Sequence, residues 1–193
     1  MRQKSLFRTI AEPLAVAIAL GLIVRGAVHI YAIPSESMAP TLKTGDQIVV
    51  TRYFRSAPRR GDVIVFASVT APGELMVKRV IATPGDLIDS RLGRVRISGY
   101  TLPEPYVLRA GTTGAVPAQV IPAESYFVMG DNREDSSDSR SWGVVPRSRV
   151  VGRARLILWS SSSAVGEAAR AAAKREPPSQ RVSVRGGLFK WIE

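Results

Sequence analysis

The apolar positions of this 193-residue chain form one long run near the N-terminus and several short runs after Ile33. The short runs are rich in Val and Ile, and turn sequences such as PRRGD, TAPGE and TPGD separate them. Short β-branched runs bounded by Gly and Pro are typical of β-strands. The pattern therefore predicts a mainly β domain, a sandwich or a barrel, over residues 34–160. The predicted strands lie within residues 45–54, 62–68, 74–82, 93–99, 125–130 and 150–160.

The long apolar run follows a basic N-terminus and is uninterrupted from Pro13 to Val24. A helix that spans a bilayer needs about 20 residues, so the run would have to continue to Ile33. The continuation includes Arg25, whose long side chain can reach the headgroups from a helix end. The expected division is residues 1–11 in the cytoplasm, a transmembrane anchor over 12–33, and everything from Pro34 onward outside the membrane.

A cleavable signal peptide is the alternative interpretation of the same run, because a short apolar core after basic residues fits it as well. No clean small-x-small cleavage site follows Arg25, which favours a retained anchor. Both interpretations place the domain after Pro34 on the exported side.

Charge and missing residue types narrow the possible chemistry. The formal net charge is +11, but the basic residues are spread along the chain, which fits contact with membrane lipid better than nucleic-acid binding. The chain has no cysteine, which excludes thiol nucleophiles, disulfides and Cys-based zinc sites. The only histidine, His29, lies in the apolar run, so neither a Ser-His-Asp triad nor a multi-histidine metal site is expected. No metal or cofactor is predicted, and a hydrolase would need another base.

The tail, residues 161–193, changes to small, charged and proline-rich sequence. It predicts a frayed helix over 164–174 followed by a linker. The ending GLFKWIE is either a membrane-surface segment or a packed terminal segment, and the sequence does not decide between them.

Lys78 is the first candidate base. In the predicted strand 74–82 it shares a face with Met76 and Val80, while Arg79 points to the opposite face. Apolar surroundings disfavour the ammonium form and lower a lysine pKa. A neutral lysine can then accept a proton from a serine hydroxyl. A solvated lysine on an edge strand is the alternative.

A second candidate is the polar segment GDNREDSSDSRSWG, residues 130–143. A calcium loop does not fit, because Arg133, Ser136 and Trp142 stand where such a loop needs an acid, a glycine and a glutamate. Two interpretations remain: a solvated loop, or a scaffold in which Asp/Arg pairs fix the backbone and serines face a polar site.

The third candidate is IPSESMAPTL, directly after the apolar run. Ser35 and Ser37 lie two apart, so an extended backbone would place both side chains on one side. Ser37 could attack a carbonyl while Ser35 donates a hydrogen bond to the developing oxyanion. A helix cap or a linker is the alternative.

Taken together, these segments resemble the type I signal peptidases, which are membrane-bound Ser/Lys proteases. The segments IPSESMAPTL, RRGDVIVF, VKRVIATPGD and GDNREDSSDSRSWG occur in that family's order, and the resemblance covers residues 12–159. It implies a mainly β, signal-peptidase/LexA-like catalytic fold with one N-terminal transmembrane helix. The segment 99–124 is short, so a compact version of the fold is expected.

The resemblance also implies residue roles. Ser37 would be the nucleophile and Lys78 the general base, with the Ser35 hydroxyl and the Ser37 backbone N–H as oxyanion donors. Ser136 would orient the lysine amine. Two supporting ion pairs are expected, Arg79 with Asp131 and Asp138 with Arg140. The shallow apolar substrate pockets would be lined by Ile33, Met38, Leu42, Met76 and Val77.

The implied function is removal of N-terminal signal peptides from exported pre-proteins, by cleavage after small residues of the A-x-A type. Expected partners are pre-protein signal peptides, membrane lipid and the protein export machinery. The implied location is the bacterial inner (cell) membrane, single-pass, with a cytoplasmic N-terminus and a periplasmic or extracytoplasmic catalytic domain. One alternative is a maturation peptidase of the same family with a single client, such as a conjugation or pilus protein. Another is a non-enzymatic, membrane-tethered β module.

Overall fold

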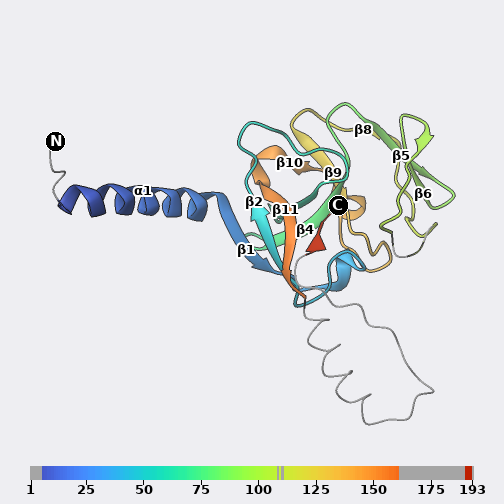
Figure 1. Ribbon diagram of the computed structural model, residues 1–193. Helices are drawn as coiled ribbons and strands as arrows, with labels where there is room; N and C mark the ends of the chain where they lie inside the picture. Colours follow the sequence, from blue (N-terminus) through green and yellow to red (C-terminus); the bar gives the residue numbers. More distant parts are fainter. Residues whose placement is uncertain (1–5, 108, 110, 161–189, 193) are drawn as a thin grey trace, which may run out of the picture.

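Two antiparallel sheets make up the domain that follows the N-terminal helix (Figure 1). The computed structural model describes residues 6–107, 109, 111–160 and 190–192. Within these residues the larger, eight-stranded sheet has the order β1-β2-β11-β3-β4-β9-β10, with β12 also paired to β11. The smaller, four-stranded sheet has the order β7-β6-β5-β8. The predicted mainly β fold is confirmed.

The strands of the larger sheet are β1 (Val28–Ala32), β2 (Gln47–Thr51), β3 (Val63–Ala67), β4 (Leu75–Ala82), β9 (Ser125–Met129), β10 (Val145–Pro146), β11 (Val150–Trp159) and β12 (Lys190–Trp191). Those of the smaller sheet are β5 (Leu87–Arg91), β6 (Arg94–Ile97), β7 (Tyr100–Thr101) and β8 (Gln119–Val120). The helical elements are α1 (Leu6–Ala27), α2 (Ser139–Trp142) and the 3-10 turns η1 (Glu36–Met38) and η2 (Arg147–Arg149).

Each of the six predicted runs contains a strand, because Val, Ile and aromatic residues fit a pleated surface buried on one or both faces. Strands β3 and β9 are buried along nearly their whole length, which explains why they appear in the sequence as continuous apolar runs rather than alternating ones. The two-residue strands β7, β8 and β10 are too short for any periodic pattern to reveal them.

The N-terminal apolar segment is divided between a helix and a strand. Helix α1 ends at Ala27, and Val28–Ala32 pairs with β2 over five residues, from Val28 opposite Thr51 to Ala32 opposite Gln47. The expected continuous segment over 12–33 thus differs in its last part, because residues 28–32 complete the edge of the larger sheet. Among the described residues, no helix combines the length and the hydropathy that a membrane crossing requires.

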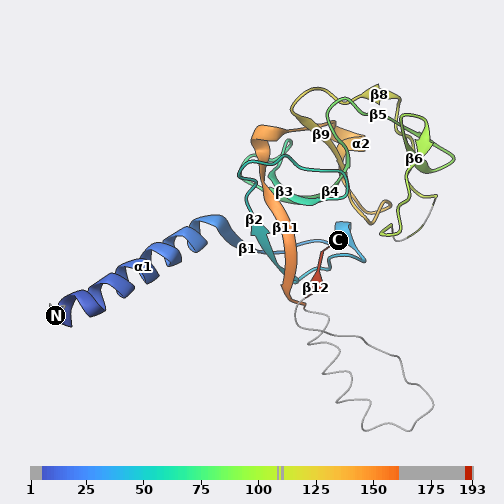
Figure 2. The same cartoon turned by 45° about the horizontal axis from the view of Figure 1, so that its top comes forward.

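Helix α1 leads away from the β domain in both ribbon views (Figures 1 and 2). Among the side chains that the structure describes in this helix, Leu14, Val16 and Ile18 are 56%, 59% and 55% accessible. These described side chains are therefore not buried against the β domain.

The described residues near the C-terminus add a short strand to the larger sheet. Strand β12 pairs with β11, with Trp191 opposite Leu156, and Ile192 is buried in the core cluster that contains Ile48, Val50 and Ile157. Of the two interpretations of GLFKWIE, the packed segment fits residues 190–192. The helix predicted over 164–174 lies outside the described residues.

Candidate active site

Ser37 lies in the turn η1, which follows the end of β1 after residues 33–35. Met38, the next residue, is 1% exposed and anchors the turn in the core. On the other side, the Asn132 backbone N–H donates to the Ser37 carbonyl at 3.1 Å. The turn is thus fixed between the core and the polar segment 130–143.

The expected extended backbone at the two serines is only half right. Ser35 is extended (φ −143°, ψ 161°), but Glu36–Met38 forms a 3-10 turn, because the chain must bend to bury Met38. The turn nevertheless keeps the two hydroxyls together, with Ser35 Oγ 3.2 Å from Ser37 Oγ.

Lys78 reaches Ser37 from β4, and its Nζ lies 2.5 Å from Ser37 Oγ. The residue is only 3% exposed. Burial lowers the pKa of Lys78 to about 8; Asp138 raises it in part, and Arg140 lowers it further. A minor fraction of Lys78 is therefore neutral near physiological pH, and a neutral amine within hydrogen-bond reach of a hydroxyl can accept its proton.

Arg79, the next residue of β4, meets Asp131 on the other side of the strand. Its Nε and Nη2 donate to the two carboxylate oxygens of Asp131 at 2.9 and 2.8 Å. Its Nη1 donates to the Gly61 carbonyl at 2.9 Å, and its guanidinium lies 4.1 Å above the Tyr106 ring. Arg79 and Asp131 are both nearly inaccessible, so the pair ties β4 to the start of the polar segment.

Asp138 organises the rest of the polar segment. Its carboxylate accepts from Arg140 Nε and Nη2, both at 2.7 Å, from the Gly130 amide at 3.0 Å and from Ser136 Oγ at 2.8 Å. Burial raises the pKa of Asp138, but these donors together outweigh burial and hold its pKa below the ordinary value. Asp138 is thus a buried carboxylate that stays ionised and holds the segment closed.

Ser136 occupies a different position from the one expected by resemblance. Among the described residues it donates to Asp138, and no hydrogen bond joins it to Lys78. Its side chain still lies beside the site, because a Cβ added at Gly130 would collide with both the Ser136 hydroxyl and the Ser37 carbonyl. The absence of a side chain at position 130 is what lets Ser136 and Ser37 come this close.

The five expected substrate-lining residues do not share one open surface. Ile33, Met38 and Leu42 are at most 3% exposed and belong to one core cluster, with Val77 packed against it. Met76 packs against a different cluster, which contains Ile64 and Phe66. Only Met76 and Val77, the two residues before Lys78, are half-exposed.

The unpaired edge of β4 runs through the same two residues. Strand β3 covers one side of β4 from Leu75 to Arg79, whereas β9 on the other side begins at Arg79. In the described part of the chain, no strand pairs with Leu75–Lys78 on that second side. An extended peptide could add to this edge and arrive beside Lys78.

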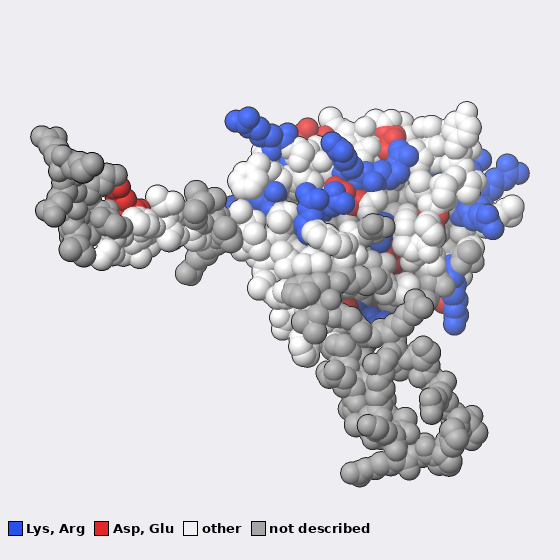
Figure 3. All heavy atoms as spheres, in the orientation of Figure 1, with Lys and Arg blue, Asp and Glu red and all other residues white. Residues whose placement is uncertain are grey.

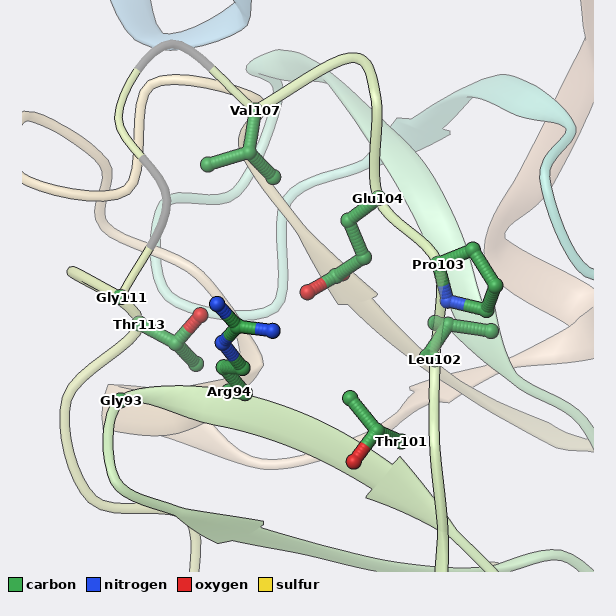
Figure 4. Close-up of a pocket in the computed structure, with 9 residues that line it drawn as sticks. All are labelled: Gly93, Arg94, Thr101, Leu102, Pro103, Glu104, Val107, Gly111 and Thr113. Atoms are coloured by element: carbon green, nitrogen blue, oxygen red, sulfur yellow. The ribbon is translucent and has the colours of Figure 1, made fainter.

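A separate cavity of about 330 Å³ lies against the smaller sheet (Figure 4). Glu104 and Thr113 point into it, with the Arg94 guanidinium between them. Arg133 supports its wall, since it donates to Glu104, to Thr113 Oγ1 and to the Gly130 carbonyl. Neither Ser37 nor Lys78 lines this cavity, so it is distinct from the Ser/Lys pair.

Sequence reasoning missed several residues that support the site. Thr41 donates to Asp131 Oδ2 at 2.5 Å, and Arg133 is 3% exposed and paired with Glu104. Thr41 lies in the motif IPSESMAPTL and Arg133 in GDNREDSSDSRSWG, so their positions could have indicated that they support the site. Glu104 comes from a Pro/Gly-rich segment whose pattern predicts only turns, and nothing in the sequence connected it to the site.

The sequence pattern of one family, described as "Signal peptidase, peptidase S26", matches residues 6–159. The chain belongs to this family. It is 42% identical to signal peptidase I of Leptolyngbya laminosa, over 76% of this chain and 75% of that protein. It is 39% identical to probable signal peptidase I-1 of Synechocystis sp., over 77% of this chain and 81% of that protein.

A solved structure of a signal peptidase I from Enterococcus faecalis aligns with 51% of this chain and 97% of its own, at 30% identity and a TM-score of 0.46. The family predicted from the four motifs is confirmed. The chain is accordingly an enzyme of a serine peptidase family, and removal of signal peptides is the function that the family supports.

Proposed function

We propose that this signal peptidase cleaves exported pre-proteins with a Ser37/Lys78 dyad. The observation that carries the proposal is the 2.5 Å approach of Lys78 Nζ to Ser37 Oγ in a buried setting that lowers the lysine pKa to about 8. Neutral Lys78 takes the Ser37 proton as Oγ attacks the scissile carbonyl. The proton then passes from Lys78 to the leaving amine, and the C–N bond breaks to leave an acyl-enzyme ester.

Hydrolysis of that ester uses the same base. Lys78, neutral again, takes a proton from water while the water oxygen attacks the ester carbonyl, and Ser37 Oγ leaves with the proton returned through Lys78. The Ser35 hydroxyl and the Ser37 backbone N–H stabilise the oxyanion in both steps. The 3.2 Å separation of the Ser35 and Ser37 hydroxyls supports this role.

The polar segment keeps the dyad in position. Asp131 with Arg79 and Asp138 with Arg140 fix the segment against β4, and Ser136 acts on the site through Asp138 rather than by direct contact with the lysine. This changes the role that the resemblance implied for Ser136 from an orienting partner of Lys78 to a positioning residue.

The substrate lies along the free edge of β4 as an added strand. Met76 and Val77 contact the residues before the cut, and the buried cluster of Ile33, Met38 and Leu42 supports Val77 from below. Shallow pockets of this kind accept small side chains at the first and third positions before the cut, which is the A-x-A pattern. The single-client alternative has no observation in its favour here.

The N-terminal segment holds the enzyme at the membrane, with residues 1–11 in the cytoplasm and the β domain outside. The exposed apolar side chains of α1 and its direction away from the domain support this arrangement. The nucleophile then lies a short distance from the membrane, where a signal peptide with its apolar core in the bilayer can reach it.

Cleavage of a pre-protein with an A-x-A signal tests the proposal. Detergent-solubilised wild type should cut after the second alanine, and Ser37→Ala and Lys78→Ala should not cut. Lys43→Ala, which removes an exposed lysine from the same region, is the matched control and should cut normally. Cleavage by Ser37→Ala or Lys78→Ala at the wild-type rate would contradict the dyad.

A further inference from the structure

A second cavity, of about 390 Å³, lies where α1 joins the larger sheet, and neither Ser37 nor Lys78 lines it. It is lined by Arg52, Tyr53, Arg147, Val150 and Val151. These residues follow β2, form η2 and begin β11. The Arg52 backbone N–H donates to the carbonyl of Ala27, the last residue of α1, at 3.4 Å. The cavity therefore adjoins the end of the helix.

The surface around the cavity is strongly basic. Lys and Arg gather on the face where β2, β10 and β11 lie (Figure 3). Arg52 is exposed, and within the described residues no hydrogen bond or ion pair engages its guanidinium. Arg147 lies over the Tyr53 ring at 5.2 Å and uses one Nη2 bond to hold the Ser56 carbonyl. Both arginines thus keep N–H groups for another acceptor.

The nearby acidic groups do not cancel this charge. Asp62 is already occupied, because it accepts from the Tyr53 hydroxyl at 2.7 Å and forms an ion pair with Arg153 at 2.8 Å. Glu124 holds the Arg147 backbone N–H through its carbonyl, but no ion pair joins the two side chains. A bound anion would find two available guanidinium groups and no free carboxylate within the cavity wall.

Phe54 adds an apolar group at the same place. It is 79% exposed and lies between Tyr53 and Arg55, in a loop that begins where α1 meets the sheet. An exposed aromatic side chain among arginines suits the boundary between headgroups and acyl chains. The apolar wall formed by Val150 and Val151 suits the glycerol end of a lipid headgroup rather than a bare inorganic ion.

We propose that this cavity binds the phosphate of an anionic phospholipid headgroup, with Arg52 and Arg147 as its ligands. The inference rests on the proposed membrane position of α1, because that position places the cavity at headgroup depth. Guanidinium groups match phosphate oxygens in geometry as well as in charge. The site would give the domain a second attachment to the membrane, in addition to its connection to α1.

The test is a calorimetric titration of the full-length protein, in a neutral detergent, with dihexanoyl-phosphatidylglycerol, which measures the dissociation constant of the lipid. Saturable binding is expected, and Arg52→Gln/Arg147→Gln should weaken it about 25-fold, since each arginine near an anionic lipid contributes about fivefold. Arg91→Gln, which removes an exposed arginine from β5, is the matched control and should bind like wild type. If the double variant is poorly folded, the single variant Arg52→Gln tests the site instead. This substitution should not disturb the fold, because the Arg52 guanidinium has no hydrogen bond or ion pair within the described residues.

Three further arms identify the ligand source. Inorganic phosphate and dihexanoyl-phosphatidylcholine should each bind far more weakly than the anionic lipid. Equal binding of inorganic phosphate, or stronger binding of a short oligonucleotide, would overturn the lipid assignment. Equal loss in Arg91→Gln, or no saturable binding, would overturn the site. The titration is repeated on Ser37→Ala protein, so that failure of the proposed chemistry and failure of the lipid site are seen separately.

Discussion

Lys78 combines near-complete burial with a proposed role that requires it to gain and lose a proton, two properties that usually exclude each other. Burial penalises its ammonium form and lowers its pKa, while the ionised Asp138 acts in the opposite direction. The result, a pKa of about 8, leaves the residue able to accept a proton from Ser37 and to return it within one turnover. The same residue in solvent would stay protonated, since the ordinary lysine pKa is about 10.4.

The first prediction concerns pH. If the neutral form of Lys78 is the base, as proposed, kcat/KM should rise with pH through about 8 and fall on the acidic side as the amine is protonated. Arg140→Gln removes a cation that lowers this pKa, so the acidic limb should move to higher pH. Pre-protein cleavage measured across pH checks both. An acidic limb near 10.4 would contradict the assignment of Lys78 as base.

A second prediction at this scale concerns Ser35. If its hydroxyl stabilises the oxyanion, Ser35→Ala should reduce kcat by about 10²–10³ with KM nearly unchanged, because the hydrogen bond forms in the transition state. Steady-state cleavage of a signal-peptide substrate gives both constants. Ser148→Ala, an exposed serine in η2, is the control and should leave both unchanged. An unaltered kcat in Ser35→Ala would remove the oxyanion role.

At the scale of elements, β4 connects the chemistry to its support. Consecutive side chains of a strand point to opposite faces, so Lys78 and Arg79 serve two separate purposes one residue apart. Arg79 holds Asp131, and through it the segment whose Asp138 influences the lysine pKa. A buried, bidentate ion pair is costly to break, because the remaining partner is left charged without compensation.

The third prediction follows from this geometry. Arg79→Met should lower the free energy of unfolding by about 3–5 kcal/mol, because it leaves the Asp131 carboxylate buried without a cation and with the Thr41 hydroxyl as its remaining side-chain donor. Adding Asp131→Leu should recover part of the loss, since no uncompensated charge then remains. Denaturant unfolding of the full chain in detergent measures both. Arg96→Met, which breaks the more exposed pair with Asp89, should cost only a small fraction as much. Equal costs would argue that burial is not decisive.

At the scale of the whole molecule, distant parts of the chain meet at β11. This strand pairs with β2 and β3 and also accepts β12, so the described C-terminal residues complete the sheet that holds the N-terminal β1. Trp191 points outward at 72% exposed, whereas Ile192 is 6% exposed in the core. The end of the chain is thus part of the domain's packing.

The fourth prediction tests this closure. Ile192→Ala should destabilise the domain by about 2 kcal/mol. This is the low end of the range for replacing a buried Ile by Ala, because the terminal strand can partly relax around the cavity. Trp191→Ala should change stability by less than about 0.5 kcal/mol, since its side chain is mostly in solvent. Thermal or denaturant unfolding compares them. A larger loss in Trp191→Ala would mean that the exposed tryptophan packs against something else.

The sequence by itself determined the mainly β fold and the family, and it proposed Ser37 and Lys78 as the two reacting groups. These depend on local signals: β-branched runs between turns, and short motifs in which Ser37 and Lys78 stand at fixed places. It also predicted that Lys78 and Arg79 face opposite ways, because alternation along a strand is a local property.

Only the tertiary structure decided what those groups touch. The end of α1 at Ala27 depends on the pairing between β1 and β2. The position of Ser136 depends on its close approach to Gly130. Arg133 and Glu104, which lie 29 residues apart in the sequence, are joined only because the fold brings them into contact. The depressed pKa of Lys78 likewise arises from burial by segments distant in sequence. Hydrogen bonds and desolvation act between neighbours in space, and the order of residues along a chain does not record which distant segments become neighbours.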